Sequence, residues 1–321
     1  MNRNRFLRCL LLSLWALALT AHAFPDRPIK LVVPWATGGS TDALARAVGQ
    51  RMSETLGQEV LIENRPGAAG TVGIGQVVKA PADGYTLAII ELPHAIAPAV
   101  LAKVPYDLER DFTPISLIGT SALVLFTNPA QGAHANVAGL VAEARAKPGT
   151  VVLAHSGNGS LSHLASELFQ QRTGAKFNLV PYRGSGPALT DLAGGLVAGH
   201  FATLASGSAL LSGGRIQAVA VAAAQRLPVQ AQVPTLAEQG VKGMVLEQWW
   251  GLVAPTGTPP KAIERIRREL HAALGHTSVR ERLRVLAIEK QPSSGEDFAR
   301  FIRSESARWQ KVAREAGLKP E

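Results

Sequence analysis

Cysteine is nearly absent from this sequence. Cys9 is the only one in 321 residues, and it lies in an N-terminal segment that we expect to be removed. The mature chain would then contain no thiol, which excludes disulfides, a thiol nucleophile and cysteine-based metal sites. The eight histidines are scattered, and none has the spacing of a zinc-binding motif, so we predict no metal ligands.

The short motifs of several enzyme classes are also missing. The sequence has no G-x-x-x-x-G-K-[ST] phosphate loop, no G-x-G-x-x-G dinucleotide fingerprint and no G-x-S-x-G nucleophile elbow. His155 stands next to Ser156, but adjacent side chains point apart, and no carboxylate is placed to orient the histidine. We therefore predict no catalytic residues and keep an extracytoplasmic hydrolase as a distant alternative.

Long hydrophobic runs are absent except at the N-terminus. Three arginines precede the apolar segment 10–20, and the small-x-small sequence AHA follows at 21–23. This order is typical of a secretory signal peptide, and the apolar run is too short for a membrane span, which needs about 20 residues. We expect residues 1–23 to be a signal peptide that is cleaved after Ala23, with the mature protein in the periplasm.

Basic charge is not concentrated in a patch. The formal net charge is +9 at pH 7, yet the densest basic stretch, 265–284, is interleaved with acidic residues. That pattern is typical of a solvated helix face, so we predict no nucleic-acid partner. A modest positive charge favours anionic solutes at long range.

Strands and helices alternate in two successive series, the second beginning near Pro129. Among these elements, the sequence pattern predicts a helix from about 40 to 56 and strands at 123–127 and 178–181. This alternation predicts parallel sheets with helices on their faces, and hence two α/β lobes of similar size. The amphipathic helices that end the chain have no partner unless they pack on the first lobe. We therefore expect lobe 1 to be discontinuous, with residues 24–125 plus about 247–321, and lobe 2 to span about 126–246.

Two stretches join a strand to a helix through a small glycine-bearing loop. The first is LVVPWATGGSTD at 31–42, and the second is HSGNGSLSH at 155–163. Backbone N–H groups and the positive end of a helix dipole converge there, which suits a carboxylate or phosphate. Because ligands of α/β sheets bind at the carboxyl ends of strands, the two loops could face each other across a cleft. Ordinary capping and turn formation are the alternative for both loops.

Ordered motifs along the whole mature chain identify a family. By their order and spacing, the chain resembles the extracytoplasmic solute receptors of tripartite tricarboxylate transporters, the Bug family. The motifs are PDRPI at 25–29, 34–42, ENRPGAAG at 63–70, ADGYTL at 82–87, VPYD at 104–107, DFTP at 111–114, YRG at 182–184, VPT at 233–235 and WWG at 249–251.

The resemblance implies a two-lobed periplasmic-binding-protein fold, type II-like, with a mostly parallel sheet flanked by helices in each lobe and the ligand cleft between the lobes. It implies a receptor without enzymatic activity or cofactor that closes on a small organic acid, a mono- or dicarboxylate, including aromatic acids. It also implies a two-component membrane permease as partner, and we expect a monomer. A receptor that binds the same solute but docks on a sensor kinase is the alternative.

The resemblance places ligand recognition in the two loops and in the neighbouring segments 91–97 and 201–206, which we expect to be loops. A bulky residue at Gly38 would then block carboxylate approach. The predicted ligand-binding residues are Trp35, Thr37, Gly38, Gly39, Ser40, Thr41, Asp42, His94, Ser156, Gly157, Asn158, Gly159, Ser160, His163, Arg183, Phe201, Ala202 and Thr203.

Three of these positions depart from the pattern of many relatives. Thr37 replaces a proline, which restores a backbone N–H and adds a hydroxyl. Ala202 replaces an aspartate and Thr203 an asparagine. Because that aspartate would be the natural partner of a ligand ammonium group, we expect an acid without a strongly recognised amine.

Overall fold

The computed structural model describes residues 24–315. The predicted signal peptide and its cleavage point after Ala23 lie outside the described residues. Between 24 and 315, no helix combines the length and the apolar character needed to cross a membrane.

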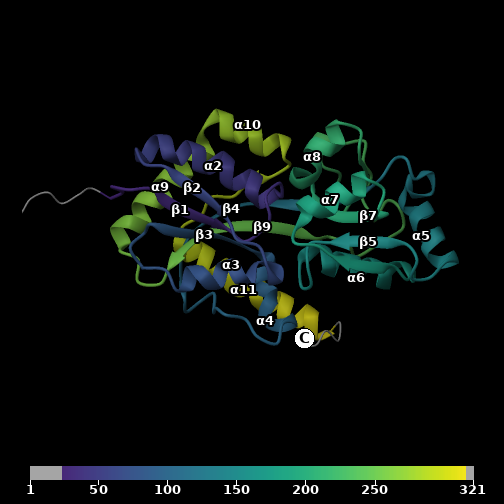
Figure 1. Cartoon of the computed structure of the whole chain (residues 1–321), viewed down its shortest axis with the longest axis horizontal. Coiled ribbons are helices and arrows are strands. Elements are labelled where there is room, and N and C mark those ends of the chain that lie inside the picture. Colours follow the sequence, from purple (N-terminus) through teal and green to yellow (C-terminus); the bar gives the residue numbers. More distant parts are fainter. Residues whose placement is uncertain (1–23, 316–321) are drawn as a thin grey trace, which may run out of the picture.

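A ten-stranded sheet runs through both halves of the molecule (Figure 1). Two short strands, β8 (Gln217–Val221) and β10 (Glu289–Lys290), pair with β4 outside the main strand order. That order is β2 (Val60–Asn64), β1 (Ile29–Val33), β3 (Thr86–Glu91), β9 (Glu247–Pro255), β4 (Phe112–Thr127), β7 (Gly199–Thr203), β5 (Val152–His155) and β6 (Asn178–Pro181).

The sheet is parallel at its two ends and antiparallel in the middle. β2, β1 and β3 are parallel, as are β7, β5 and β6. β9 and β4 lie between these groups and pair antiparallel with their neighbours. β4 serves both halves, because it pairs with β9 as far as Ala122 and with β7 from Leu123 onward. The predicted two-lobed α/β fold is confirmed, with antiparallel strands where the lobes join.

Helices cover both faces of the sheet in each lobe (Figure 1). In the first lobe, α2 (Ser40–Leu56), α9 (Pro260–Gly275) and α10 (Thr277–Val285) lie opposite α3 (Thr71–Val78), α4 (Leu92–Val100) and α11 (Gly295–Glu315). The second lobe carries α5 (Val137–Ala146), α6 (Leu161–Thr173), α7 (Ser185–Ala193) and α8 (Leu204–Ser212). Leu31 and Val33 of β1 belong to one core and Val32 to the other, as expected for a strand that is buried on both faces.

The last helix packs closely against the centre of the sheet. Phe298 and Phe301 of α11 meet Trp249 of β9 edge-on, with ring centroids 6.0 and 5.4 Å apart. Gly251 permits this approach, since a Cβ at that position would lie 1.8 Å from the Phe298 ring. α11 also contacts α4 and β4, so the end of the chain packs on the first lobe.

Three segments differ from what the sequence predicts. Residues 201–206 are not a loop but the end of β7 and the start of α8. Residues 91–97 are not a loop but the last residue of β3 and the start of α4, because Glu91 and His94 form a capping box at this helix. β4 begins at Phe112, well before the expected strand at 123–127. Pro114 and Gly119 interrupt its apolar pattern, and both lie beside register shifts in its pairing with β9.

Candidate functional site

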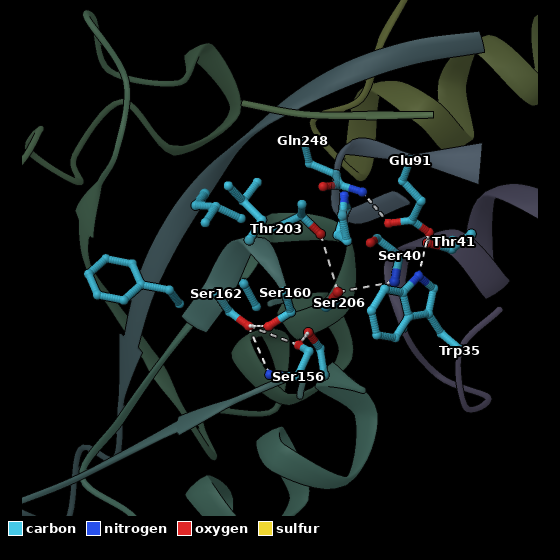
Figure 2. Close-up of a pocket in the computed structure, with 17 residues that line it drawn as sticks. Trp35, Ser40, Thr41, Glu91, Ser156, Ser160, Ser162, Thr203, Ser206 and Gln248 are labelled. Carbon is cyan, nitrogen blue, oxygen red and sulfur yellow. Dashed lines mark hydrogen bonds between the residues drawn. The ribbon is translucent and has the colours of Figure 1, made fainter. Parts of the chain in front are cut away.

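A cavity of about 60 Å³ lies between the lobes, where β1, β3, β5 and β7 end and α2, α4, α6 and α8 begin. Figure 2 shows side chains from both lobes facing it. Its polar groups are mostly hydroxyls. The lining residues are Trp35, Gly39, Ser40, Thr41, Glu91, Pro93, Leu123, Ser156, Ser160, Leu161, Ser162, Ser185, Phe201, Ala202, Thr203, Ser206 and Gln248.

The first loop leaves the N-terminus of α2 without a side-chain cap. The N-cap residue is Gly39, which has no side chain to accept from the first-turn amides. The N–H of Ser40 instead donates to the hydroxyl of Ser206, at 3.0 Å. Ser206 belongs to α8 of the other lobe, so this bond joins the two lobes at the cavity (Figure 2).

The second loop supplies the N-cap of the helix that follows it. The hydroxyl of Ser160 caps α6 by accepting from the N–H of His163, at 3.2 Å. The hydroxyl of Ser162 accepts from the N–H of Ser156 at 2.8 Å, and the hydroxyls of Ser156 and Ser185 lie 2.8 Å apart. This lobe therefore presents a cluster of hydroxyls, each of which can donate or accept a hydrogen bond.

Glu91 is a buried carboxyl in the wall of the cavity. Its Oε1 accepts from Trp35 Nε1 at 2.6 Å and from Thr41 Oγ1 at 2.5 Å, and its Oε2 accepts from Gln248 Nε2. The Thr41 hydroxyl itself accepts from Trp250 Nε1, so its proton is directed to Glu91. Burial raises the pKa of Glu91 to about 8, while the three donors act to lower it.

Half of the predicted ligand-binding residues line this cavity. They are Trp35, Gly39, Ser40, Thr41, Ser156, Ser160, Phe201, Ala202 and Thr203. Eight further residues line the cavity. Five of them lie in the segments that were expected to complete the pocket, namely Glu91, Pro93, Leu161, Ser162 and Ser206, and three lie outside those segments, namely Leu123, Ser185 and Gln248. A lone glutamate at the end of the buried strand 86–91 was a signal for Glu91, whereas Gln248 sits in a strand whose first half has no clear apolar pattern.

Asp42 and His94 lie outside the cavity lining and stabilise the first lobe. Asp42 pairs with Arg46 and accepts from the N–H of Gly38 at 3.2 Å. His94 is fully buried, and its Nδ1 accepts from the N–H of Glu91 at 2.9 Å. Burial lowers the pKa of His94 to about 3, so this imidazole is neutral.

The other predicted residues outside the cavity lining lie at its margins. His163 stacks on His155, with ring centroids 4.4 Å apart. Gly38 is exposed at φ +92°, and a Cβ there would meet nothing within 4 Å, so a bulky side chain would extend into open space. The remaining residues of this group are Thr37, Gly157, Asn158, Gly159 and Arg183, of which Thr37, Asn158 and Arg183 are exposed.

The chemistry of the cavity is that of neutral donors around one acidic group. Among the described residues, no lysine, arginine or histidine lines it. No cluster of three or more potential metal ligands occurs between residues 24 and 315. An anion here would therefore meet amide and hydroxyl groups but no cationic side chain among the lining residues.

Comparison with known proteins places this geometry in a family. The profile described as "Tripartite tricarboxylate transporter family receptor" (TctC) matches residues 44–318. The protein BugT of Bordetella pertussis is 37% identical over 306 residues, which cover 95% of this chain and 94% of BugT.

Solved structures agree with the sequence match. An R. palustris protein with adipate is 37% identical, with a TM-score of 0.88 over 93% of this chain and 100% of that one. MatC from Rhodopseudomonas palustris, with bound malate, is 32% identical, with a TM-score of 0.85 over 90% of this chain and 100% of MatC. The resemblance noted from the motifs is confirmed: the chain belongs to the TctC family of tripartite tricarboxylate transporter receptors, the family of the Bug proteins.

Proposed function

We propose that this protein binds a small carboxylate-containing solute between its two lobes and delivers it to a tripartite tricarboxylate-type transporter in the membrane. The observation that carries the proposal is the convergence of two helix N-termini on one hydroxyl-lined cavity. Amide and hydroxyl donors can hold a carboxylate there without a charged side chain. Relatives with adipate and with malate support this class of ligand.

The lobes close on the ligand about β4 and the start of β9. We assign residues 24–125 and 247–321 to lobe 1 and residues 126–246 to lobe 2. The switch in β4 pairing between Ala122 and Leu123 supports this division. Each lobe supplies part of the donor set, so only the closed state satisfies both ends of the ligand, and the ligand shifts the population toward it.

The protein acts as a monomeric receptor in the periplasm, exported by the signal peptide at 1–23, without a cofactor and without catalysing a reaction. Its partner is a two-component permease. The family description and the relatives described as periplasmic binding proteins support this assignment. The alternative is that the ligand-bound receptor docks on a sensor kinase instead of a permease.

A ligand screen tests the binding. Thermal shift and calorimetry of the mature chain should identify at least one mono- or dicarboxylic acid, aromatic acids included, that raises the melting temperature and binds with one-to-one stoichiometry. A series of neutral sugars of similar size is the control. If no acid binds, the carboxylate proposal is wrong.

A transport assay tests the delivery. Uptake of the labelled acid into vesicles that contain the permease should require this receptor, and a receptor with the cavity blocked should not restore it. Binding without receptor-dependent uptake, together with activation of a sensor kinase, would favour the signalling alternative.

A further inference from the structure

The cavity contains one carboxyl group and, among its lining residues, no cationic side chain to pair with it. Glu91 is 3% exposed and sits at the end of β3, with the indole of Trp35 and the hydroxyl of Thr41 on one oxygen and the amide of Gln248 on the other (Figure 2). All three partners donate. The network is therefore built around an acceptor carboxylate.

A buried carboxylate is costly unless a charge of opposite sign accompanies it. The charged and titratable groups of the surrounding elements do not supply one. On α2, Arg46 is engaged by Asp42, and on α4, His94 accepts a hydrogen bond from the backbone N–H of Glu91 and is neutral. The facing residues of β9 and of the first loop, Gln248 and Trp35, carry no charge.

We propose that Glu91 is a specificity-determining residue that selects a ligand with a positively charged group. The solute is then a zwitterion of the amino-acid type, with its carboxylate on the amides and hydroxyls and its ammonium on Glu91. This inference rests on the proposed function and narrows the ligand class. It replaces the expectation of an acid without a recognised amine, which considered only Ala202 and did not include Glu91.

The carboxylate has capacity for such a group. Its Oε2 accepts from a single side chain, Gln248, whereas Oε1 accepts from two. The backbone N–H of His94, which the capping box directs at the same carboxyl, shares the remaining lone-pair sites. The raised pKa of Glu91 reflects the cost of its charge in the empty cavity, and a ligand ammonium would remove that cost. Binding at neutral pH therefore releases the proton that Glu91 holds when the cavity is empty.

Matched ligand pairs provide the experiment. Calorimetry compares 2-aminoadipate with adipate and aspartate with malate, each pair on one carbon skeleton, in two buffers of different ionisation enthalpy. For at least one pair, the amine should bind roughly ten- to a hundredfold more tightly, as a charge-assisted hydrogen bond provides. Binding of the amine should release nearly one proton from Glu91 at pH 7 and none at pH 9.

Two variants locate the effect. Glu91→Gln keeps the shape and should abolish both the preference for the amine and the proton release. Glu269→Gln is the control, since Glu269 is also buried but pairs with Arg265 and Arg268 on α9, and it should change neither. The ligand pairs and proton counts in the unmodified protein keep the test valid if Glu91→Gln fails to fold.

The outcomes are separable. Plain acids that bind as tightly as their amines, without proton release, would overturn the role of Glu91 while leaving the proposed function intact. Proton uptake with a plain acid would overturn it too and would show that a protonated Glu91, with the Gln248 amide reversed, meets the ligand. If neither acids nor amines bind, the proposed function itself fails.

Discussion

The two loops that meet at the cavity have the same topology but opposite capping. In the first, α2 begins after Gly39 without a side-chain cap, and the N–H of Ser40 donates to a hydroxyl from the other lobe. In the second, Ser160 caps α6 from within the loop. The same strand–loop–helix unit thus provides amide donors in one lobe and hydroxyls in the other. We infer that the first loop gives up local stability so that a ligand can take the place of Ser206.

The largest effect should come from removing the amide of Ser40 without disturbing the helix. Ser40 is the first residue of α2, where proline is tolerated, and Gly39 is extended at φ −81°, ψ 173°, as the residue before a proline prefers. Ser40→Pro should weaken binding of the acid found by screening roughly a hundredfold, because it removes a charge-assisted donor and places a ring carbon in its position.

Ser40→Ala is the matched control. It keeps the N–H and removes only the hydroxyl, so its affinity should stay within about threefold of the unmodified protein. Calorimetry on both variants measures the difference. Equal affinities for Ser40→Pro and Ser40→Ala would show that the ligand does not use the first loop as we infer.

The second effect concerns the buried carboxyl, which only the first lobe contributes to the cavity. The pKa of Glu91 is raised in the folded protein, so between its unfolded value and pH 8 the folded state holds a proton that the unfolded state has lost. Relative to the Glu91→Gln variant, stability of the empty protein should therefore fall by about 1.5 kcal/mol from pH 6.5 to 8, and the difference should level off above pH 8.

The buried histidines act in the opposite direction in part of this window. Burial lowers the pKa of His94 to about 3 and the pKa values of His155 and His200 to about 4, so stability rises as the unfolded state loses their protons around pH 6.5. Urea denaturation of both proteins at each pH measures the difference, in which the histidine contributions cancel. Equal pH dependence in the two proteins would mean that Glu91 does not hold the proton.

The third effect is on the self-capped helix. Ser160→Ala removes the cap of α6 and should destabilise the ligand-free protein by about 1 kcal/mol. Ser40→Ala, which removes a hydroxyl that caps nothing, should cost less than about 0.5 kcal/mol. Urea denaturation of both variants compares the two loops directly, and equal losses would contradict the difference in capping.

The sequence predicted most elements because their patterns are strong. The helix at 40–56 and the strand at 178–181 have the predicted bounds. The predicted strand at 123–127 is only the second part of β4, because Pro114 and Gly119 interrupt the apolar pattern of the first part. The pairing with β9 and then with β7 makes the two parts one strand. The two loops at the cavity followed from local chemistry. Glu91 lay in the segment 91–97 that was expected at the pocket, but Gln248 could not be predicted, since it reaches Glu91 only through the antiparallel pairing of β3 with β9.

Sequence also could not separate polar residues that face a ligand from those that support the loop. Asp42 and Ser40 lie two residues apart in one helix turn, yet Asp42 turns inward to Arg46 and to the N–H of Gly38, while Ser40 lines the cavity. Their roles depend on the path of the chain around Gly38, whose positive φ places that N–H over the carboxylate.

The smallest change in stability should come from giving the first loop the cap that the second one has. A Cβ on Gly39 would have only the carbonyl oxygen of Ala36 nearby, at 3.9 Å, so Gly39→Ser fits. Serine improves on glycine as an N-cap by a few tenths of a kcal/mol, so the empty protein should become slightly more stable. Its affinity for the acid should fall at the same time, because the new hydroxyl accepts from the amides that the ligand needs. Thermal melting and calorimetry on one preparation measure both quantities. A stabilised variant with unchanged affinity would mean that the uncapped N-terminus of α2 does not contribute to the binding site.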